Sequence, residues 1–254
     1  MEDNFEQYCR ESALAYQTIP DVHPDDFIFK FILGHPNWTD PKDAVWYYFS
    51  DGRSSALKLR ETLSSDLGVD LSAPLTMLEF ASGYGCVTRH LPRILPDVSI
   101  VASDIHPQAN EFIRQKIGVN SIQSAAVPEV FPKVFFYDVV FALSFFSRMP
   151  KKTWTRWLKV LSDQLNVNGH LIFTTHGVIS ARKLMPDLQF DEEGFSFHEA
   201  SEQDDLSKAE YGHYGNNSFL RDSCSRTIGQ LSGSSFQGRF LVGPSGPLGD
   251  PEDS

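Results

Sequence analysis

The chain has 254 residues, of which 41% are hydrophobic, and its formal net charge is −11 at pH 7. This length and composition allow one sizeable core, so we expect one main globular domain with additions. The negative charge repels phosphate backbones and no Lys/Arg stripe offsets it, so nucleic acid is not expected as a partner. Three widely spaced cysteines, Cys9, Cys86 and Cys224, indicate neither a disulfide framework nor a zinc site.

The N-terminal residues and the longest apolar run indicate where in the cell the protein is expected. The first residues, MEDNFEQYCRES, are acidic and lack the basic start and apolar core of a secretory signal. The longest apolar stretch, residues 134–146, contains Asp138 and falls short of the roughly 20 residues of a membrane-spanning helix. We therefore expect a cytoplasmic protein without a membrane partner.

Residues 1–70 are expected to form an N-terminal helical cap. Prolines interrupt its early segments, and only residues 43–68 have a helical pattern. The prolines are Pro20, Pro24, Pro36 and Pro41.

In residues 71–180, short apolar runs alternate with helical stretches. Strands are expected at 75–81, 98–104, 120–125, 137–143 and 169–176, and helices at 87–95, 107–118 and 151–165. Parallel neighbours need crossover connections, so this alternation predicts a parallel sheet with helices on both faces. The expected fold class is α/β, a doubly wound, mostly parallel, Rossmann-like sheet of six or seven strands.

The last part of the chain has a different pattern. Residues 181–244 are expected to form a lid or flap with the last strand or strands of the same domain. They include a helix-like stretch at 218–231 and a strand candidate at 237–243. Residues 245–254 are rich in Gly, Pro, Ser and Asp and are expected to form a frayed tail.

The stretch EFASGYG, residues 79–85, ends the first expected strand with a glycine turn that begins a helix. Such a turn presents backbone N–H groups to a ligand. Thr88 stands where a dinucleotide motif has its third glycine, and Glu79 would repel a pyrophosphate. Asp104 ends the second strand about 20 residues later, where an acid typically holds ribose hydroxyls. These residues therefore favour a nucleoside ligand without a phosphate.

The same residues resemble the E/D-x-G-x-G-x-G motif of class I S-adenosylmethionine-dependent methyltransferases, with Ala81 in place of the first glycine. Asp104 matches the ribose-binding acid of this family, and the resemblance extends over roughly residues 46–177. It includes residues 137–150, which are similar to the fourth strand and its loop, and residues 165–169, which are similar to the turn before the fifth strand. The resemblance implies S-adenosylmethionine as cofactor and methyl transfer to a small-molecule acceptor, at oxygen or nitrogen, by in-line displacement.

The resemblance also implies which residues bind the cofactor. Tyr48, with Gly52, would close over its methionine end. Ser124 stands where many relatives carry an adenine-binding acid, so adenine recognition falls to Ser124, to the backbone that follows it or to apolar packing. The implied residues are Tyr48, Glu79, Phe80, Ala81, Ser82, Gly83, Tyr84, Gly85, Asp104, Ile105, Ser124, Ala125, Ala126, Leu143 and Ser144.

Candidates for catalysis and acceptor binding lie later in the chain. His176, at the end of the fifth expected strand, is the first candidate general base and His213 the second. Arg148 could hold a substrate carboxylate, and Phe145 and Tyr211 favour an apolar or aromatic acceptor. A packing role for His176 and a solvent-exposed role for Arg148 stay open. No spacing of His, Cys, Asp and Glu indicates a metal.

Two other functions stay open. A non-catalytic cofactor-binding relative is suggested by Ala81, Ser124 and the altered turn at residues 165–169. A nicotinamide-dependent oxidoreductase is favoured by the α/β pattern and by Asp104, but Glu79 and Thr88 oppose it.

Overall fold

The computed structural model describes residues 2–175 and the shorter segments 187, 189, 192, 195–198, 217–220 and 238–241. It divides into two compact units, Met1–Gln123 and Ser124–Ser254. Most of the expected lid (181–244) and the whole expected tail (245–254) lie outside the described residues.

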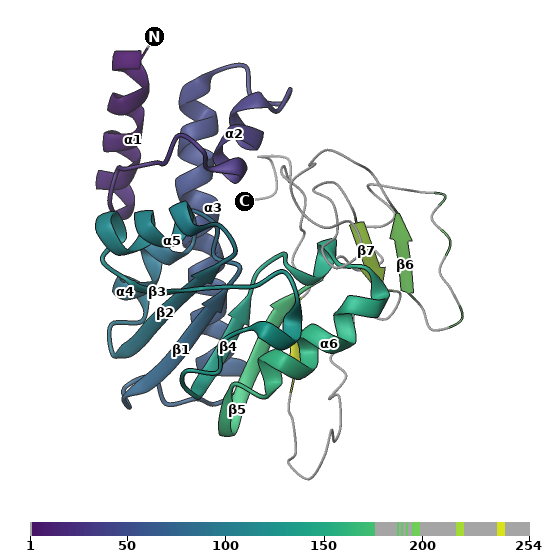
Figure 1. Cartoon of the computed structure of the whole chain (residues 1–254). Coiled ribbons are helices and arrows are strands. Elements are labelled where there is room, and N and C mark those ends of the chain that lie inside the picture. The colour runs from purple at the N-terminus through teal and green to yellow at the C-terminus, as the bar shows by residue number, and fades with distance from the viewer. Residues whose placement is uncertain are drawn as a thin grey trace. The chain divides into compact units, whose positions relative to one another are not determined.

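The first unit begins with three helices, α1 (Glu2–Tyr16), α2 (Phe27–Gly34) and α3 (Pro41–Glu61), which pack against one another (Figure 1). α3 continues into a π-helical turn at Thr62–Asp66. The sequence predicted only the helix at 43–68, so α1 and α2 correct that prediction. The prolines lie between the helices or, at Pro41, in the first turn of α3, where a missing N–H costs nothing. They mark helix ends rather than irregular structure.

Polar caps and aromatic packing fix this helical layer. The Asp26 side chain accepts a hydrogen bond from the Phe29 backbone N–H at 3.0 Å and caps α2. The Phe29 ring packs edge-on against Tyr48 of α3, with ring centroids 4.9 Å apart. Both side chains are buried, so α2 is held on α3 by its own capped first turn.

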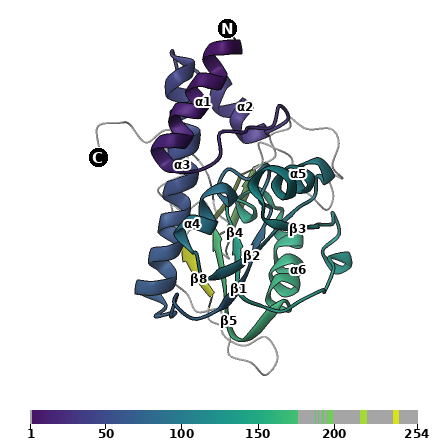
Figure 2. The same cartoon turned by 90° about the vertical axis from the view of Figure 1, so that its left-hand side faces the viewer.

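Three parallel strands, β1 (Leu75–Phe80), β2 (Val98–Asp104) and β3 (Asn120–Gln123), form the sheet of the first unit in the order β3-β2-β1. A 3₁₀ turn at Thr88–His90 and α4 (Leu91–Ile94) connect β1 to β2. α5 (Pro107–Phe112) and a π-helical turn at Ile113–Ile117 connect β2 to β3. The carboxyl ends of the strands lie at the edge nearest α2 and α5 (Figures 1 and 2).

Gly52 lets α3 lie directly against the chain that follows β1. A Cβ atom at position 52 would lie 2.1 Å from the backbone oxygen of Cys86, closer than any side chain allows. Only glycine therefore permits this approach. The contact sets the position of α3 relative to the glycine turn.

The second unit contains β4 (Tyr137–Ala142), α6 (Lys151–Ser162), β5 (Leu165–Thr174) and β8 (Gly238–Leu241). β5 pairs in parallel with β4 and with β8. The expected turn at 165–169 lies within β5. Its register against β4 shifts from Tyr137↔Leu165 to Val139↔His170, so the extra residues bulge out of the ladder, and Asn168 has a φ of 65°.

A separate pair of antiparallel strands belongs to the second unit. β6 (Phe195–His198) pairs with β7 (Asn217–Leu220). The stretch 218–231 was expected to be helix-like, but its first three residues belong to β7. Pairing with β6 satisfies the backbone groups of these residues, and this long-range partner is not visible in the local sequence pattern.

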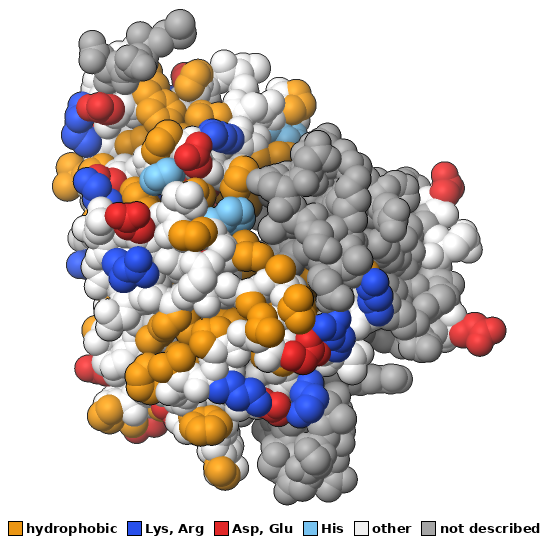
Figure 3. Space-filling model, viewed as in Figure 1, with side chains coloured by type: hydrophobic (Ala, Val, Ile, Leu, Met, Phe, Trp, Pro, Cys, Tyr) orange, Lys and Arg blue, Asp and Glu red, His pale blue; other side chains and the backbone are white. Residues whose placement is uncertain are grey.

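Parallel strands alternating with helices confirm the α/β, Rossmann-like fold class in both units. The expected count of six or seven strands and the lid stay predictions. No helix of the described residues is long and apolar enough to cross a membrane. Some hydrophobic side chains of the helical layer remain exposed, among them Ile28 and Phe31 of α2, and Figure 3 shows such side chains in orange over this part of the surface.

Candidate functional site

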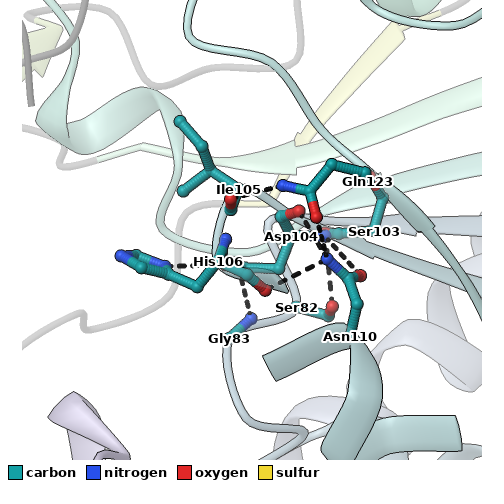
Figure 4. Close-up of polar contacts among 8 residues, drawn as sticks. All are labelled: Ser82, Gly83, Ser103, Asp104, Ile105, His106, Asn110 and Gln123. Carbon is teal, nitrogen blue, oxygen red and sulfur yellow. Dashed lines mark hydrogen bonds and ion pairs between the residues drawn. The ribbon is translucent and has the colours of Figure 1, made fainter. Parts of the chain in front are cut away.

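The glycine turn after β1 has an unusual backbone conformation and is tied to β2. Ala81, Gly83 and Gly85 have φ values of 58°, 55° and 81°, in the left-handed region that favours glycine. The backbone N–H and the hydroxyl of Ser82 both donate to the backbone oxygen of Ser103, at 3.0 and 3.2 Å. The turn is therefore held at the carboxyl end of β2, as Figure 4 shows.

Asp104 lies directly beside this turn. Its Oδ2 accepts a hydrogen bond from the Gly83 N–H at 2.8 Å, and its Oδ1 accepts one from the His106 N–H at 2.9 Å (Figure 4). The His106 Nδ1 lies 2.9 Å from the same Oδ1. A carboxylate offers about four acceptor positions, so three contacts leave capacity at Oδ2. The structure thus brings together the two parts of the motif that the sequence placed about 20 residues apart.

Two amide side chains hold the backbone around Asp104. The Asn110 amide donates to the backbone oxygen of Asp104 at 2.8 Å and accepts from its N–H at 3.2 Å. The Gln123 amide donates to the backbone oxygen of Ile105, the next residue (Figure 4). Sequence reasoning missed both residues, because neither belongs to a motif. Their signal is weak: Asn110 is a polar residue on the helix after Asp104, and Gln123 ends the next strand.

Glu79 has a buried carboxyl group at the end of β1. Its side chain is 3% exposed, and Oε2 has no hydrogen-bond partner among the described residues. Burial, with a smaller contribution from the charge of Asp104, raises the pKa of Glu79 to about 8 against the opposing effect of a hydrogen bond with the Thr88 side chain. The group is therefore protonated at neutral pH and keeps one polar atom available to a ligand.

The segment between α1 and α2 covers part of the glycine turn. The His23 ring stacks on Tyr84, with centroids 4.4 Å apart and planes 19° apart. The Phe27 ring lies 5.4 Å from that of His106. Tyr84 and His106 are the residues next in sequence to Gly83 and near Asp104, so His23 and Phe27 place aromatic rings beside the residues that make the Gly83–Asp104 hydrogen bond.

Tyr48 belongs to a buried polar network instead of an open surface. Its hydroxyl donates to Asp26 Oδ2 at 2.7 Å and accepts from Arg89 Nη2 at 3.1 Å. Arg89 also donates from Nε to the backbone oxygen of Gly85 at 3.0 Å and from Nη1 to that of Asp21 at 2.9 Å. This network joins the glycine turn to the helical cap. Sequence reasoning missed Asp26 and Arg89, although Asp26 stands at the start of a short apolar helix.

The other expected cofactor residues belong to the second unit. Ser124 is buried, and its hydroxyl has no partner among the described residues. Ser144 has a φ of 56°, and its N–H donates to Thr174 Oγ1 at 2.7 Å. Phe145 is buried with its ring centroid 5.4 Å from that of Trp157, which favours a core role over acceptor binding. Ala125, Ala126 and Leu143 are partly exposed.

Most of the residues expected to act in catalysis or acceptor binding are not among the described residues. His176, His213 and Tyr211 lie outside the described residues. The backbone of Arg148 ends a 3₁₀ turn at Phe146–Arg148. Within the described part of the chain, no three His, Cys, Asp or Glu side chains gather as a metal site would require.

Comparison with protein families identifies the part of the chain that holds these residues. Residues 78–171 match a family model described as a methyltransferase domain. The matched region begins one residue before Glu79, includes the glycine turn and Asp104, and ends in β5.

Comparisons with individual proteins add three solved structures. PKMT2 from Rickettsia typhi, in complex with AdoHcy, is 15% identical over 43% of this chain and 22% of its own, with a TM-score of 0.38. DesVI from Streptomyces venezuelae is 13% identical over 72% of this chain and 66% of its own, with a TM-score of 0.43. The plantazolicin methyltransferase BpumL, with a desmethylPZN analog and SAH, is 14% identical over 76% and 68%, with a TM-score of 0.44. The chain thus spans about a fifth to two thirds of the length of these structures. A search of the curated proteins finds no match.

Proposed function

We propose that the methyltransferase domain binds S-adenosylmethionine and transfers its methyl group to a small-molecule acceptor, at oxygen or nitrogen. The observation that carries the proposal is the hydrogen bond between Gly83 and Asp104, which joins the glycine turn to the acid at the end of β2. A turn of this kind lets a ligand approach the backbone, and an adjacent carboxylate accepts hydrogen bonds from a ribose.

The residues of the first unit fit this cofactor. Asp104 has acceptor capacity at Oδ2 for a ribose hydroxyl, and a Cβ added at Gly83 would meet nothing within 4 Å, so the turn is open on that side. The unpartnered Oε2 of Glu79 is a buried polar atom that a ligand with an amino group would satisfy.

The remaining cofactor roles rest on the resemblance of the sequence. We assign Phe80, Ile105, Leu143 and Ser144 to the walls of the cofactor site. Ser124, with Ala125 and Ala126, is assigned to adenine; the unpartnered Ser124 hydroxyl supports this. Tyr48 was expected to touch the cofactor, and its burial between Asp26 and Arg89 favours a positioning role.

When bound, the sulfonium of S-adenosylmethionine supplies an electrophilic methyl group. The chain has to align the acceptor atom with it and exclude water, and residues 23–27 contribute to that exclusion at the glycine turn. We assign proton removal from the acceptor to His176, with His213 as second candidate, and acceptor binding to Arg148 and Tyr211. The net charge of −11 supports an acceptor other than nucleic acid. The three widely spaced cysteines support a location in the reducing cytoplasm.

Calorimetry with S-adenosylmethionine and with its demethylated product tests cofactor binding. We expect saturable heat with both ligands and a raised melting temperature. No heat and an unchanged melting temperature would reject the proposal. A melting temperature that rises with NADH alone would revive the oxidoreductase alternative.

Methyl transfer is tested separately by mass spectrometry of a small-molecule acceptor library incubated with the protein and the cofactor. Products heavier by one methyl group are expected, and His176→Ala should lower turnover while leaving cofactor affinity unchanged. Cofactor binding without any methylated product across the library would favour the non-catalytic relative.

A further inference from the structure

A basic cavity lies within the first unit, away from the glycine turn. The end of α1, the second half of α3 and the segment of α4 surround a cavity of about 380 Å³. Figure 2 shows these three helices converging on the side that faces the viewer. Its charged lining residues are Arg53 and Arg60 of α3 and Arg93 of α4, with His90 directly before α4. None of these residues belongs to the proposed cofactor site.

The three guanidinium groups of this cavity have no acidic partner within the part of the chain that the structure describes. No carboxylate among the described residues lies within ion-pair distance of Arg53, Arg60 or Arg93, whereas Lys58 on the same helix pairs with Glu61 at 2.8 Å. Three unpaired arginines in one cavity are unexpected in a protein with a net charge of −11, because acidic side chains are in excess. Arginine is the side chain whose planar fork matches phosphate oxygens best.

His90 provides an independent observation at the base of this cavity. Its side chain is 2% exposed, and its Nε2 has no hydrogen-bond partner among the described residues. A buried ring nitrogen without a partner is costly, and a bound molecule would remove that cost. Burial and the positive charges of Arg89 and Arg53 lower the pKa of His90 to about 4, although a hydrogen bond with the Phe49 backbone acts in the opposite direction. The neighbourhood thus carries positive charge that an anion would offset.

We propose that this cavity, bounded by Arg53, Arg60, Arg93 and His90, binds a small molecule that bears a phosphate group. The guanidinium groups hold the phosphate oxygens, and the neutral His90 ring accepts a hydrogen bond at Nε2 from a hydroxyl group of the ligand. The Tyr16 ring, with the Arg53 guanidinium 6.0 Å from its centroid, forms an aromatic wall for the rest of the molecule. A cavity of this volume is within the range of small-molecule sites.

The position of His90 connects this cavity to the proposed cofactor site. Arg89, the preceding residue, donates to the backbone oxygen of Gly85, and Thr88 lies beside Glu79. The Thr88–His90 turn therefore has one face toward the glycine turn and the other toward the cavity. A phosphorylated ligand in the cavity would contact the same turn that supports the cofactor motif, so the site is placed to act as an effector site.

Binding is measured by calorimetry and thermal shift with inorganic phosphate, sulfate and ribose 5-phosphate, at constant ionic strength set with chloride. Saturable binding is expected for the wild type. Arg60→Gln and Arg93→Gln should each weaken it by roughly tenfold, because each removes a charge-assisted hydrogen bond. Lys58→Gln removes one positive charge from the same helix outside the cavity and should bind as the wild type does. Both arginines are exposed, so their variants are expected to fold.

The outcomes separate the ligand classes and the two proposals. Tighter binding of ribose 5-phosphate than of phosphate assigns the site to a phosphorylated metabolite; equal binding assigns it to the free ion. No saturable binding of any of the three anions, or equal binding by the Arg60→Gln and Arg93→Gln variants, would overturn the inference. S-adenosylmethionine binding by the same variants reports on the proposed function separately.

Discussion

The Gly83 N–H donates to Asp104 Oδ2 across 2.8 Å, and this single hydrogen bond joins the glycine turn after β1 to the acid that ends β2. Both partners come from segments that the sequence marks clearly. Gly83 has a left-handed backbone, and Asp104 is only 6% exposed. The pair is therefore both a structural link and the centre of the proposed cofactor site.

Replacing Asp104 with alanine should weaken binding of S-adenosylmethionine by about 1 to 3 kcal/mol, because charged hydrogen bonds to the ligand are lost. The same variant leaves the Gly83 N–H without its acceptor, so a lower melting temperature is expected too. Asp97→Ala serves as control, since Asp97 is exposed and lies before β2, at the opposite end of that strand. Calorimetry on both variants checks the prediction, and equal cofactor affinity in the two would contradict it.

Ala81 and Gly83 have the same left-handed backbone conformation, so substitutions at the two positions test how much strain a side chain causes there. Both have a φ near 55–58°, but only Ala81 has a Cβ. Ala81→Gly should raise the free energy of unfolding by roughly 0.5–1 kcal/mol, since a left-handed alanine is strained and glycine is not. Gly83→Ala should lower it by a similar amount, and no atom lies within 4 Å of the added Cβ to confuse the result. Denaturant unfolding measures both changes; shifts of the same sign would show that strain does not decide them.

Tyr48→Phe tests whether the Tyr48 hydroxyl supports the cap or contacts the cofactor. The change removes a donor to Asp26 and an acceptor for Arg89 in a fully buried position, so we expect a loss of about 1–3 kcal/mol in unfolding free energy. The neighbouring Tyr47 is half-buried, and its hydroxyl donates one long hydrogen bond, to Asp51 Oδ1 at 3.4 Å, so Tyr47→Phe should cost less than Tyr48→Phe. A cofactor affinity that falls while stability is unchanged would assign Tyr48 to the ligand instead.

The sheet was predictable from the sequence because short apolar runs have a strong local signal. The expected strand at 98–104 coincides with β2, and that at 75–81 differs from β1 by one residue. α1 and α2 were missed because prolines were read as breaks within the cap rather than as helix ends. β7 was misread because its partner β6 lies about 20 residues away, and local propensity does not reveal such pairing.

The candidate site was predictable only in its motif residues. Glu79, Gly83 and Asp104 stand at strand ends, where parallel sheets place their ligands. Asn110 donates to the backbone oxygen of Asp104, and Arg89 donates to that of Gly85 in the same glycine turn. Hydrogen bonds from a side chain to a backbone atom follow no motif of residue types, so supporting residues of this kind emerge only from the fold.

Glu79 should make the stability of the protein depend on pH in the direction opposite to most acids. Between its ordinary pKa of 4.5 and about 8, the folded carboxyl keeps a proton that the unfolded chain has released. The Glu79 contribution to the free energy of unfolding therefore falls as pH rises through this window, by up to about 1.4 kcal/mol per pH unit.

Glu79→Gln keeps the size of the side chain and cannot ionise, so it should match the wild type near pH 5 and be more stable near pH 8. Glu111→Gln, on the exposed face of α5, is the control and should follow the wild-type curve. Denaturant unfolding from pH 5 to 8.5 measures all three proteins, and parallel curves for Glu79→Gln and the wild type would mean that Glu79 is ionised in the folded state at neutral pH.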